Sequence, residues 1–180
     1  MIALCAAFII AISPDQCLSE KWPPVITQYA LPILSWGQYY NVHPDLIAAV
    51  ILSESSGYTN VVHENGIVGL MGVMSSANPD FPNRSSAEAL LDPNINIRDG
   101  TYILSLLIER YKGDVRLSLA VYNCGEDKVS RNACGSGAGT NYADKIIVKL
   151  DKMSLWPIGN KSPLEVYECS RKRFLQSLCY

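Results

Sequence analysis

The stretch HPDLIAAVILSESSG, residues 43–57, decides how the rest of the chain is interpreted. Pro44 fits the first turn of a helix, and Asp45 is favoured there by the positive end of the helix dipole. Apolar residues then recur at helical spacing. The closing Ser-Ser-Gly is typical of a helix C-terminus. The stretch therefore predicts a helix with a strongly apolar face that begins at Pro44 and ends just before Gly57.

Glu54 stands on the apolar face of this predicted helix. It continues the helical spacing of Ile47, Val50 and Ile51, which should face the core. Burial disfavours a charged carboxylate, and the negative end of the helix dipole acts in the same direction, so both raise the pKa of the carboxyl. A carboxylic acid that keeps its proton at neutral pH is what a glycosidic leaving oxygen requires. The alternative is a glutamate that points to solvent or binds a neighbouring hydroxyl.

The rest of the chain also reads as helices joined by polar loops, without a convincing run of alternating strands. We predict a helix over 25–40, which starts near Pro32 or is kinked there, and a short helix over 85–92 that a capping box opens. A long helix over 94–112 should stop at Gly113, and Asp114 should cap the next helix. Two more helices are expected, one over 142–152 after the glycine-rich loop 135–139 and one after Pro163. A short element is expected at 69–74. The fold class is therefore all-α, with one globular domain over about residues 25–152 and short or no β element.

Composition places the chain among globular proteins. Of its 180 residues 48% are hydrophobic and 18% are charged, and the formal net charge is −2. Such a chain can bury one real core. The basic run 171–173 is short and reads more simply as a solvated helix face, so we predict no nucleic-acid partner.

The two ends of the chain read as additions to this domain. Residues 2–13 are apolar but fall short of the roughly 20 needed to cross a bilayer, and their length suits the apolar part of a secretory signal. The positive charge that opens a signal is missing, and a helix packed on the core is the alternative. We expect residues 1–20 to be signal-like, the protein to be exported to the periplasm or the cell exterior, and 153–180 to form a C-terminal extension. Membrane contact is expected only through the N-terminal segment, if it is not cleaved.

The cysteines predict disulfides and no metal site. The sequence holds Cys5, Cys17, Cys124, Cys134, Cys169 and Cys179, and it has no Cys-x-x-Cys pair of the kind that binds zinc or forms thioredoxin-like sites. The last four fall into two local pairs. In an exported protein the simplest pairing joins Cys124 to Cys134 and Cys169 to Cys179. Other connectivities and free buried thiols stay open.

Further motifs follow Glu54 in a specific order. The segment GIVGLMG occupies 66–72 and AVYN occupies 120–123, with DPNINIRDG at 92–100 between them. Together with the lead-in at 43–50, their order and spacing resemble the lytic transglycosylase domain of the soluble-transglycosylase family, which is related to goose-type lysozyme. The resemblance covers about residues 40–130. It implies a lysozyme-like fold and an enzyme that acts on the glycan strands of peptidoglycan, without metal or organic cofactor. We expect a monomer.

The resemblance also assigns roles to individual residues. Glu54 would be the catalytic acid and then the base. Substrate binding would fall to residues around a glycan cleft, namely Ser55, Gly69, Leu70, Met71, Tyr122, Asn123 and Tyr142. Ser55 would either hold the turn of the glutamate or touch the substrate, and core packing is the alternative for the whole set. One departure matters, because the family's glutamine after Leu-Met is Gly72 here.

The reaction implied is cleavage of the β-1,4 bond between N-acetylmuramic acid and N-acetylglucosamine, with 1,6-anhydromuramic acid ends. Two alternatives stay open. One is a lysozyme-type hydrolase in which a second carboxylate activates water, with Glu64, Asp80 and Asp92 as candidates. The other is a non-catalytic glycan-binding protein on the same fold, which the replacement at Gly72 favours.

Overall fold

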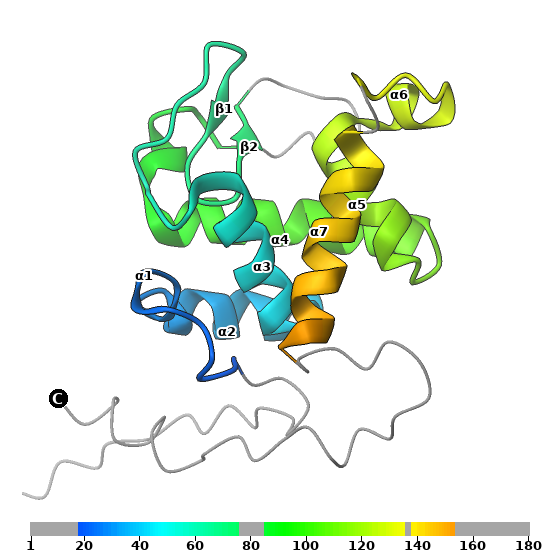
Figure 1. The fold of residues 1–180 in the computed structure, drawn as a ribbon. Helices are drawn as coiled ribbons and strands as arrows, with labels where there is room; N and C mark the ends of the chain where they lie inside the picture. Colours follow the sequence, from blue (N-terminus) through cyan, green and yellow to red (C-terminus); the bar gives the residue numbers. More distant parts are fainter. Residues whose placement is uncertain (1–17, 76–84, 136–137, 154–180) are drawn as a thin grey trace, which may run out of the picture.

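The computed structural model describes residues 18–75, 85–135 and 138–153 (Figure 1). Its elements in chain order are α1 (Pro24–Thr27), α2 (Ala30–Tyr40), α3 (Pro44–Ser55), β1 (Ile67–Val68), β2 (Val73–Met74), the 3-10 turn η1 (Ala89–Leu91), α4 (Pro93–Arg110), α5 (Val115–Cys124), α6 (Glu126–Ser130) and α7 (Ala138–Lys152). Helices dominate the described chain, and its sheet has only two short strands. The predicted all-α class is confirmed.

Helix α3 forms the centre of the core. It packs on α2 and on α7, and every residue from Leu46 to Ile51 is buried. The predicted apolar face, with Ile47, Val50 and Ile51, is buried as expected. The other positions of this part of α3 are buried as well, because other elements surround the helix on all sides. Only the last turn approaches the surface, where Ser53 is exposed and Glu54 is half-buried.

Both ends of α3 lie where the sequence predicts them. Pro44 is the first helical residue, and the His43 side chain caps the helix by accepting a hydrogen bond from the Asp45 amide at 3.2 Å. At the other end Ser56 and Gly57 have positive φ angles of 55° and 85°. A side chain at Gly57 would also meet the carbonyl of Val25 at 2.7 Å, so a glycine is required there.

The predicted helix over 25–40 is two helices. The short α1 ends at Thr27, and α2 begins at Ala30. Pro32 is the third residue of α2. A proline in the first turn interrupts no hydrogen bond of the helix, so α2 starts before the proline rather than kinking at it.

The predicted short element at 69–74 is part of a hairpin. Strands β1 and β2 pair antiparallel, with Ile67 opposite Met74 and Val68 opposite Val73. The turn between them contains two residues with positive φ, Gly69 at 77° and Gly72 at 61°. Glycine adopts this conformation without the steric cost that other residues carry.

The second half of the chain is ordered by local caps. The Asp92 carboxylate accepts from the Ile95 amide at the start of α4, and the Asp114 carboxylate accepts from the Leu117 amide at the start of α5, as such N-caps do. Gly113 ends the preceding segment with a φ of 86°. Two predicted boundaries are wrong. The helix over 85–92 is only the turn η1, and α7 begins at Ala138 rather than near residue 142.

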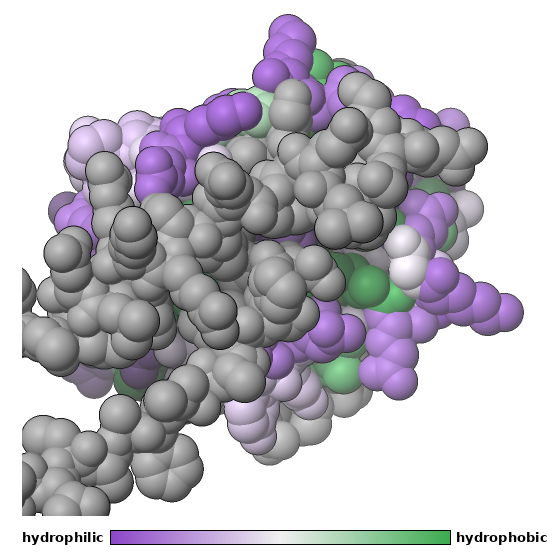
Figure 2. All heavy atoms as spheres, turned by 90° about the horizontal axis from the view of Figure 1, so that it is seen from below, coloured by the Kyte–Doolittle hydropathy of each residue, from purple (hydrophilic) through white to green (hydrophobic). Residues whose placement is uncertain are grey.

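None of the helices in residues 18–75, 85–135 and 138–153 is long and apolar enough to span a bilayer. On the face drawn in Figure 2 the coloured surface is mainly hydrophilic, and hydrophobic residues show only in small separate areas. The proposed pair Cys169 and Cys179, nearly all of the segment 1–20, and the extension after residue 153 lie outside the described residues.

Candidate active site

Glu54 lies in the last turn of α3 with its carboxyl half-buried. Burial raises the pKa of this carboxyl, and this is the largest effect on it. Two neighbours act in the opposite direction and lower the pKa, first the hydroxyl of Tyr142 and then the charge of His63. The predicted direction is therefore confirmed. His63, an ordinary loop histidine by sequence, joins the site as a second polar neighbour.

Tyr142 reaches Glu54 from α7. Its hydroxyl is buried and has no well-aligned hydrogen-bond partner among the described residues. It nevertheless lies close enough to Glu54 for each group to shift the pKa of the other. The pKa of Tyr142 is raised well above its ordinary value, chiefly by burial and then by the charge of Glu54. The phenol thus faces the carboxyl that the sequence predicts to be catalytic.

Gly72 reaches Glu54 from the hairpin turn. A Cβ built on Gly72 would lie 2.5 Å from Oε2 of Glu54 and 3.0 Å from its Cδ. Real Cβ atoms do not approach other heavy atoms so closely. A side chain here would therefore displace the end of the Glu54 side chain, and the positive φ of Gly72, 61°, would strain its backbone. The departure from the family's glutamine is therefore built into the surroundings of the acid.

The turn that carries Gly72 is held by side chains from three helices. Asn96 of α4 accepts a hydrogen bond from the amide of Met71 at 2.8 Å and donates to the carbonyls of Val68 at 2.9 Å and Leu90 at 2.8 Å. Its side chain is 1% exposed. Sequence reasoning missed Asn96 as a functional residue, because only its place within the 92–100 motif marks it and the partners are far along the chain.

Ser55 takes the first of its two expected roles. Its hydroxyl donates to the carbonyl of Leu70 at 2.8 Å and to that of Ile51 at 3.0 Å, and it accepts from the amide of Gly57 at 3.1 Å. The residue is buried. Ser55 therefore joins the end of α3 to the hairpin turn, next to Glu54, with its hydroxyl fully engaged.

Leu70 and Met71 are both 0% exposed, so core packing, the alternative reading, describes their side chains. Gly69 is buried as well, and a side chain there would collide with the amide of Asn96. A side chain at Gly100 would likewise run into Met71. The segment 69–72 therefore lies next to Glu54 with its backbone rather than with exposed side chains. We call this backbone segment the floor of the site.

Tyr122 and Asn123 lie at the end of α5. The Tyr122 hydroxyl donates to the carbonyl of Met71 at 2.7 Å, and its ring is half-buried. Tyr122 therefore connects α5 to the same floor that Asn96 and Ser55 hold. Asn123 is exposed, immediately before the disulfide-bonded Cys124. The structure thus brings Tyr122 and Tyr142 to the surroundings of Glu54, and leaves Asn123 at the surface beside the end of α5.

A comparison with known proteins identifies the family of this chain. Residues 32–144, more than half of the chain, match the family model described as Transglycosylase SLT domain. The chain belongs to this family.

Similarity to one relative and to one solved structure agrees with this family. A transglycosylase of Enterobacteria phage PRD1 is 31% identical over 126 residues, which are 69% of this chain and 42% of the phage protein. The chain therefore spans less than half the length of that relative. The X-ray structure of an inactive mutant of lytic transglycosylase Slt from Pseudomonas aeruginosa matches with a TM-score of 0.60 and 19% identity, over 78% of this chain and 26% of that one. This likeness shows the fold, and the predicted lysozyme-like architecture is confirmed.

The predicted candidates for a second carboxylate do not join Glu54 in the described part of the SLT domain. Asp92 is exposed and caps α4, and Glu64 is exposed in the loop before β1. Asp80 lies outside the described residues. Among the described residues no carboxylate contributes to the pKa shift of Glu54.

The described part of the SLT domain has no group of His, Cys, Asp and Glu side chains that could hold a metal ion. A surface hollow between α2 and the end of α4 is lined by Tyr40, Ser105 and Lys112 among others. None of its lining residues belongs to the surroundings of Glu54, so the hollow gives no support to a role in the chemistry.

Proposed function

We propose that this chain is a peptidoglycan lytic transglycosylase that cleaves the β-1,4 bond between N-acetylmuramic acid and N-acetylglucosamine. The observation that carries the proposal is the half-buried carboxyl of Glu54, whose pKa is raised by burial. It supports a single acid and base, since no other carboxylate among the described residues acts on it. Membership of the transglycosylase SLT family supports the substrate class.

The first step is protonation of the leaving oxygen. Glu54 gives its proton to the bridging oxygen, the bond from this oxygen to C1 of the muramic acid breaks, and the oxygen keeps the electron pair. Positive charge develops at C1. A raised pKa favours this step because the acid must still hold its proton at working pH.

The second step closes a ring within the same sugar. The ionised Glu54 takes the proton of the C6 hydroxyl, and the oxygen attacks C1 to form the 1,6-anhydro bond. The acid returns to its protonated form and no water is consumed. An internal hydroxyl has a very high effective concentration, so no side chain has to position a water molecule.

The remaining residues have supporting roles in the proposal. Tyr142 faces the carboxyl and stabilises its ionised form, because a hydroxyl close to a carboxylate lowers its pKa. Gly72 leaves room for the carboxyl where the family has a glutamine. Asn123, exposed at the end of α5, is proposed to contact the sugar. Because the substrate is cell wall, we propose that the protein acts in the cell envelope or outside the cell.

Mass analysis of the products tests this function. Purified peptidoglycan is digested with the wild type, with Glu54→Gln and with the matched control Glu64→Gln, which changes an exposed glutamate of the neighbouring loop. We expect anhydromuramic ends from the wild type and the control, and a loss of turnover of about 10²- to 10⁴-fold in Glu54→Gln. Binding of the variant to sedimented cell walls should persist.

Two other outcomes would replace the proposal. Reducing muramic acid ends in place of anhydro ends would make the protein a lysozyme-type hydrolase. If the wild type binds cell walls and releases no fragments, the protein is a glycan-binding protein. The replacement of the family's glutamine by Gly72 would then account for the missing activity.

A further inference from the structure

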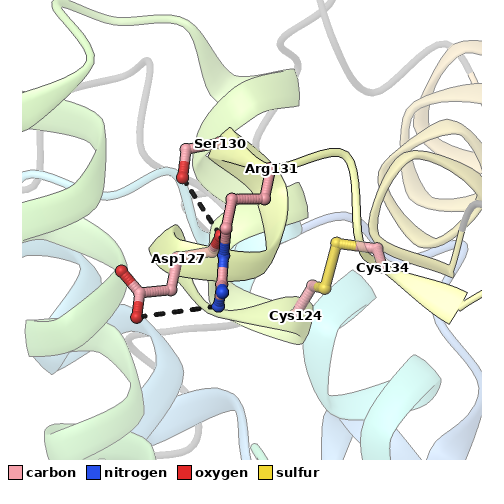
Figure 3. The surroundings of a disulfide bond; sticks show 5 residues. All are labelled: Cys124, Asp127, Ser130, Arg131 and Cys134. Carbon is pink, nitrogen blue, oxygen red and sulfur yellow. Dashed lines mark hydrogen bonds and ion pairs between the residues drawn. A yellow bond between two sulfur atoms is a disulfide. The ribbon is translucent and has the colours of Figure 1, made fainter.

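The disulfide between Cys124 and Cys134 closes the loop between α5 and α7 (Figure 3). The two Cα atoms are 5.9 Å apart, and the predicted local pair is confirmed. Cys124 is the last residue of α5 and lies two residues after Tyr122, whose hydroxyl binds the carbonyl of Met71 next to the candidate active site.

Few other contacts hold this loop to the domain. No residue of α6 is fully buried, and of its residues only Val129, partly buried, packs against the hydrophobic core. The Glu126 carboxylate accepts hydrogen bonds from Arg110 and Tyr111 of the α4 end, at 2.6 and 2.8 Å, but these are exposed contacts that stabilise little. Arg131 and Ser130 turn towards Asp127 within the loop itself (Figure 3). The bridge is therefore the strong tie.

The bridge lies against the first turn of α7. Gly139 of that turn is buried, and a Cβ there would be 3.2 Å from Sγ of Cys134, 3.2 Å from Cβ of Cys124 and 3.0 Å from the carbonyl oxygen of Ala120. The backbone of α7 therefore rests directly on the disulfide and on the end of α5. A shift of the disulfide would move the backbone of α7 at this point, because closely packed atoms transmit displacements.

The same face of α7 carries Tyr142. Gly139 and Tyr142 are three residues apart, so they lie one above the other on one side of the helix. Tyr142 then faces Glu54 across the site. The disulfide thus touches the first turn of the helix that carries the phenol facing Glu54.

We propose that the Cys124–Cys134 disulfide is a positioning element of the active site, which seats α7 so that Tyr142 faces Glu54, and that the reduced chain folds but turns over substrate poorly. The inference rests on the proposed function. It implies that the chain is held at low activity where thiols stay reduced and gains activity in an oxidising compartment.

The activating step is an ordinary thiol–disulfide exchange. A disulfide oxidant, such as oxidised glutathione or the disulfide of an oxidising partner protein, accepts two electrons and is reduced to two thiols. One cysteine thiolate attacks it, forms a mixed disulfide and releases the first thiol of the oxidant. The second cysteine thiolate then attacks the mixed disulfide, displaces the second thiol of the oxidant and closes the Cys124–Cys134 bond. The two cysteines together lose two electrons and two protons.

The decisive variant is Cys124→Ser with Cys134→Ser, which removes this bridge alone, whereas a reductant also acts on the other cysteines. It is compared with oxidised wild type, wild type reduced with dithiothreitol, and Ile33→Val, a core change in α2 remote from the site that controls for loss of stability. We expect kcat on purified peptidoglycan to fall about tenfold or more in the double variant and the reduced wild type, with a smaller change in KM. Reoxidation should restore the wild type and not the variant, and Ile33→Val should keep its kcat.

A second readout does not depend on turnover. Glu54 is faced by Tyr142 from α7 and by His63 from the loop before β1, and Tyr122 of α5 acts in turn on Tyr142. Burial is the largest cause of the raised pKa of Glu54, so loosening α7 should move that pKa down towards its ordinary value. Carboxyl NMR titration of glutamate-labelled protein measures it in the oxidised wild type and in the double variant.

An unchanged kcat and an unchanged Glu54 titration in the double variant would overturn the inference. An oxidised wild type that releases no anhydro products would instead overturn the proposed function. In that case the NMR titration still decides whether the bridge positions α7.

Discussion

The carboxyl of Glu54 lies against the backbone of Gly72, so that a methyl group at position 72 would fit only if the carboxyl moved aside. The Cβ that any other residue would carry at position 72 would stand 2.5 Å from Oε2 of Glu54. The acid at the end of α3 and the hairpin turn are thus fitted to one another.

Gly72→Ala should reduce turnover more than stability. The positive φ of 61° costs an alanine roughly 1–2 kcal/mol, and the added Cβ also displaces the Glu54 carboxyl. Gly113→Ala is the matched control, because its φ is 86° but a Cβ there meets nothing within 4 Å. Urea unfolding should show similar losses in both variants, while kcat falls about tenfold or more only in Gly72→Ala.

Restoring the family residue should not help this chain. Gly72→Gln brings the same Cβ against Glu54, so we expect turnover no higher than that of Gly72→Ala. A rise above the wild-type rate would mean that the surroundings of Glu54 relax to admit the side chain, and would contradict the fit described here.

Tyr142→Phe should move the pH profile of kcat upward. The variant keeps the ring that buries Glu54 but loses the hydroxyl that lowers its pKa, so the pKa of Glu54 rises. A general acid loses activity as pH rises through its pKa, and the basic limb of the profile should therefore shift to higher pH. Tyr111→Phe removes a hydroxyl bound to Glu126, away from the site, and should leave the profile in place. A downward shift in Tyr142→Phe would show that the hydroxyl does not stabilise the carboxylate.

Asn96→Ala should cost about 2–4 kcal/mol of unfolding free energy, since three buried hydrogen bonds are lost and their backbone partners stay unpaired. Asn94→Ala, two residues earlier on α4, loses only the exposed contact with Trp36 and should cost less than about 1 kcal/mol. Urea titration of both variants measures the difference. Equal losses of unfolding free energy in the two variants would mean that the turn between β1 and β2 does not depend on Asn96.

Asp45 should make the protein less stable as pH rises through about 6. Burial raises its pKa from 3.8 to about 6, although Trp22 and the amide of Ser19 donate hydrogen bonds to Oδ1. Among the described residues Oδ2 is buried without a hydrogen bond, 3.9 Å from Nδ1 of His43. The folded state therefore binds the proton more tightly than the unfolded chain. The resulting stability is complete below about pH 4 and is lost as pH rises through the folded pKa, by about 3 kcal/mol in all.

Asp45→Asn removes this titration and keeps an acceptor for Trp22. The difference in unfolding free energy between wild type and variant, measured from pH 4 to pH 8, should change by that amount in favour of the variant. A constant difference across this range would show that the buried carboxyl does not titrate near pH 6.

Much of the chain's local structure could be predicted because its signals are local. Pro44 and Gly57 bound α3, Asp92 and Asp114 cap the following helices, and Gly113 ends the segment before α5. Each of these residues acts on backbone groups within a few positions of itself. Where a cap has little to stabilise, as at the capping box before η1, the predicted helix shrinks to a single turn.

The sequence alone also identified Glu54 as a misplaced charge on an apolar helix, and its motifs identified the family. Tertiary structure decided how that acid is held. Gly72 of the hairpin turn and Tyr142 of α7 lie beside it, and Asn96 of α4 holds the turn through the amide of Met71. All three are 18 or more residues from Glu54 along the chain. No periodicity encodes such contacts, because they arise only when separate elements pack together. The pattern thus pointed to Glu54 as the candidate acid, and packing decided the surroundings that raise the pKa of its carboxyl.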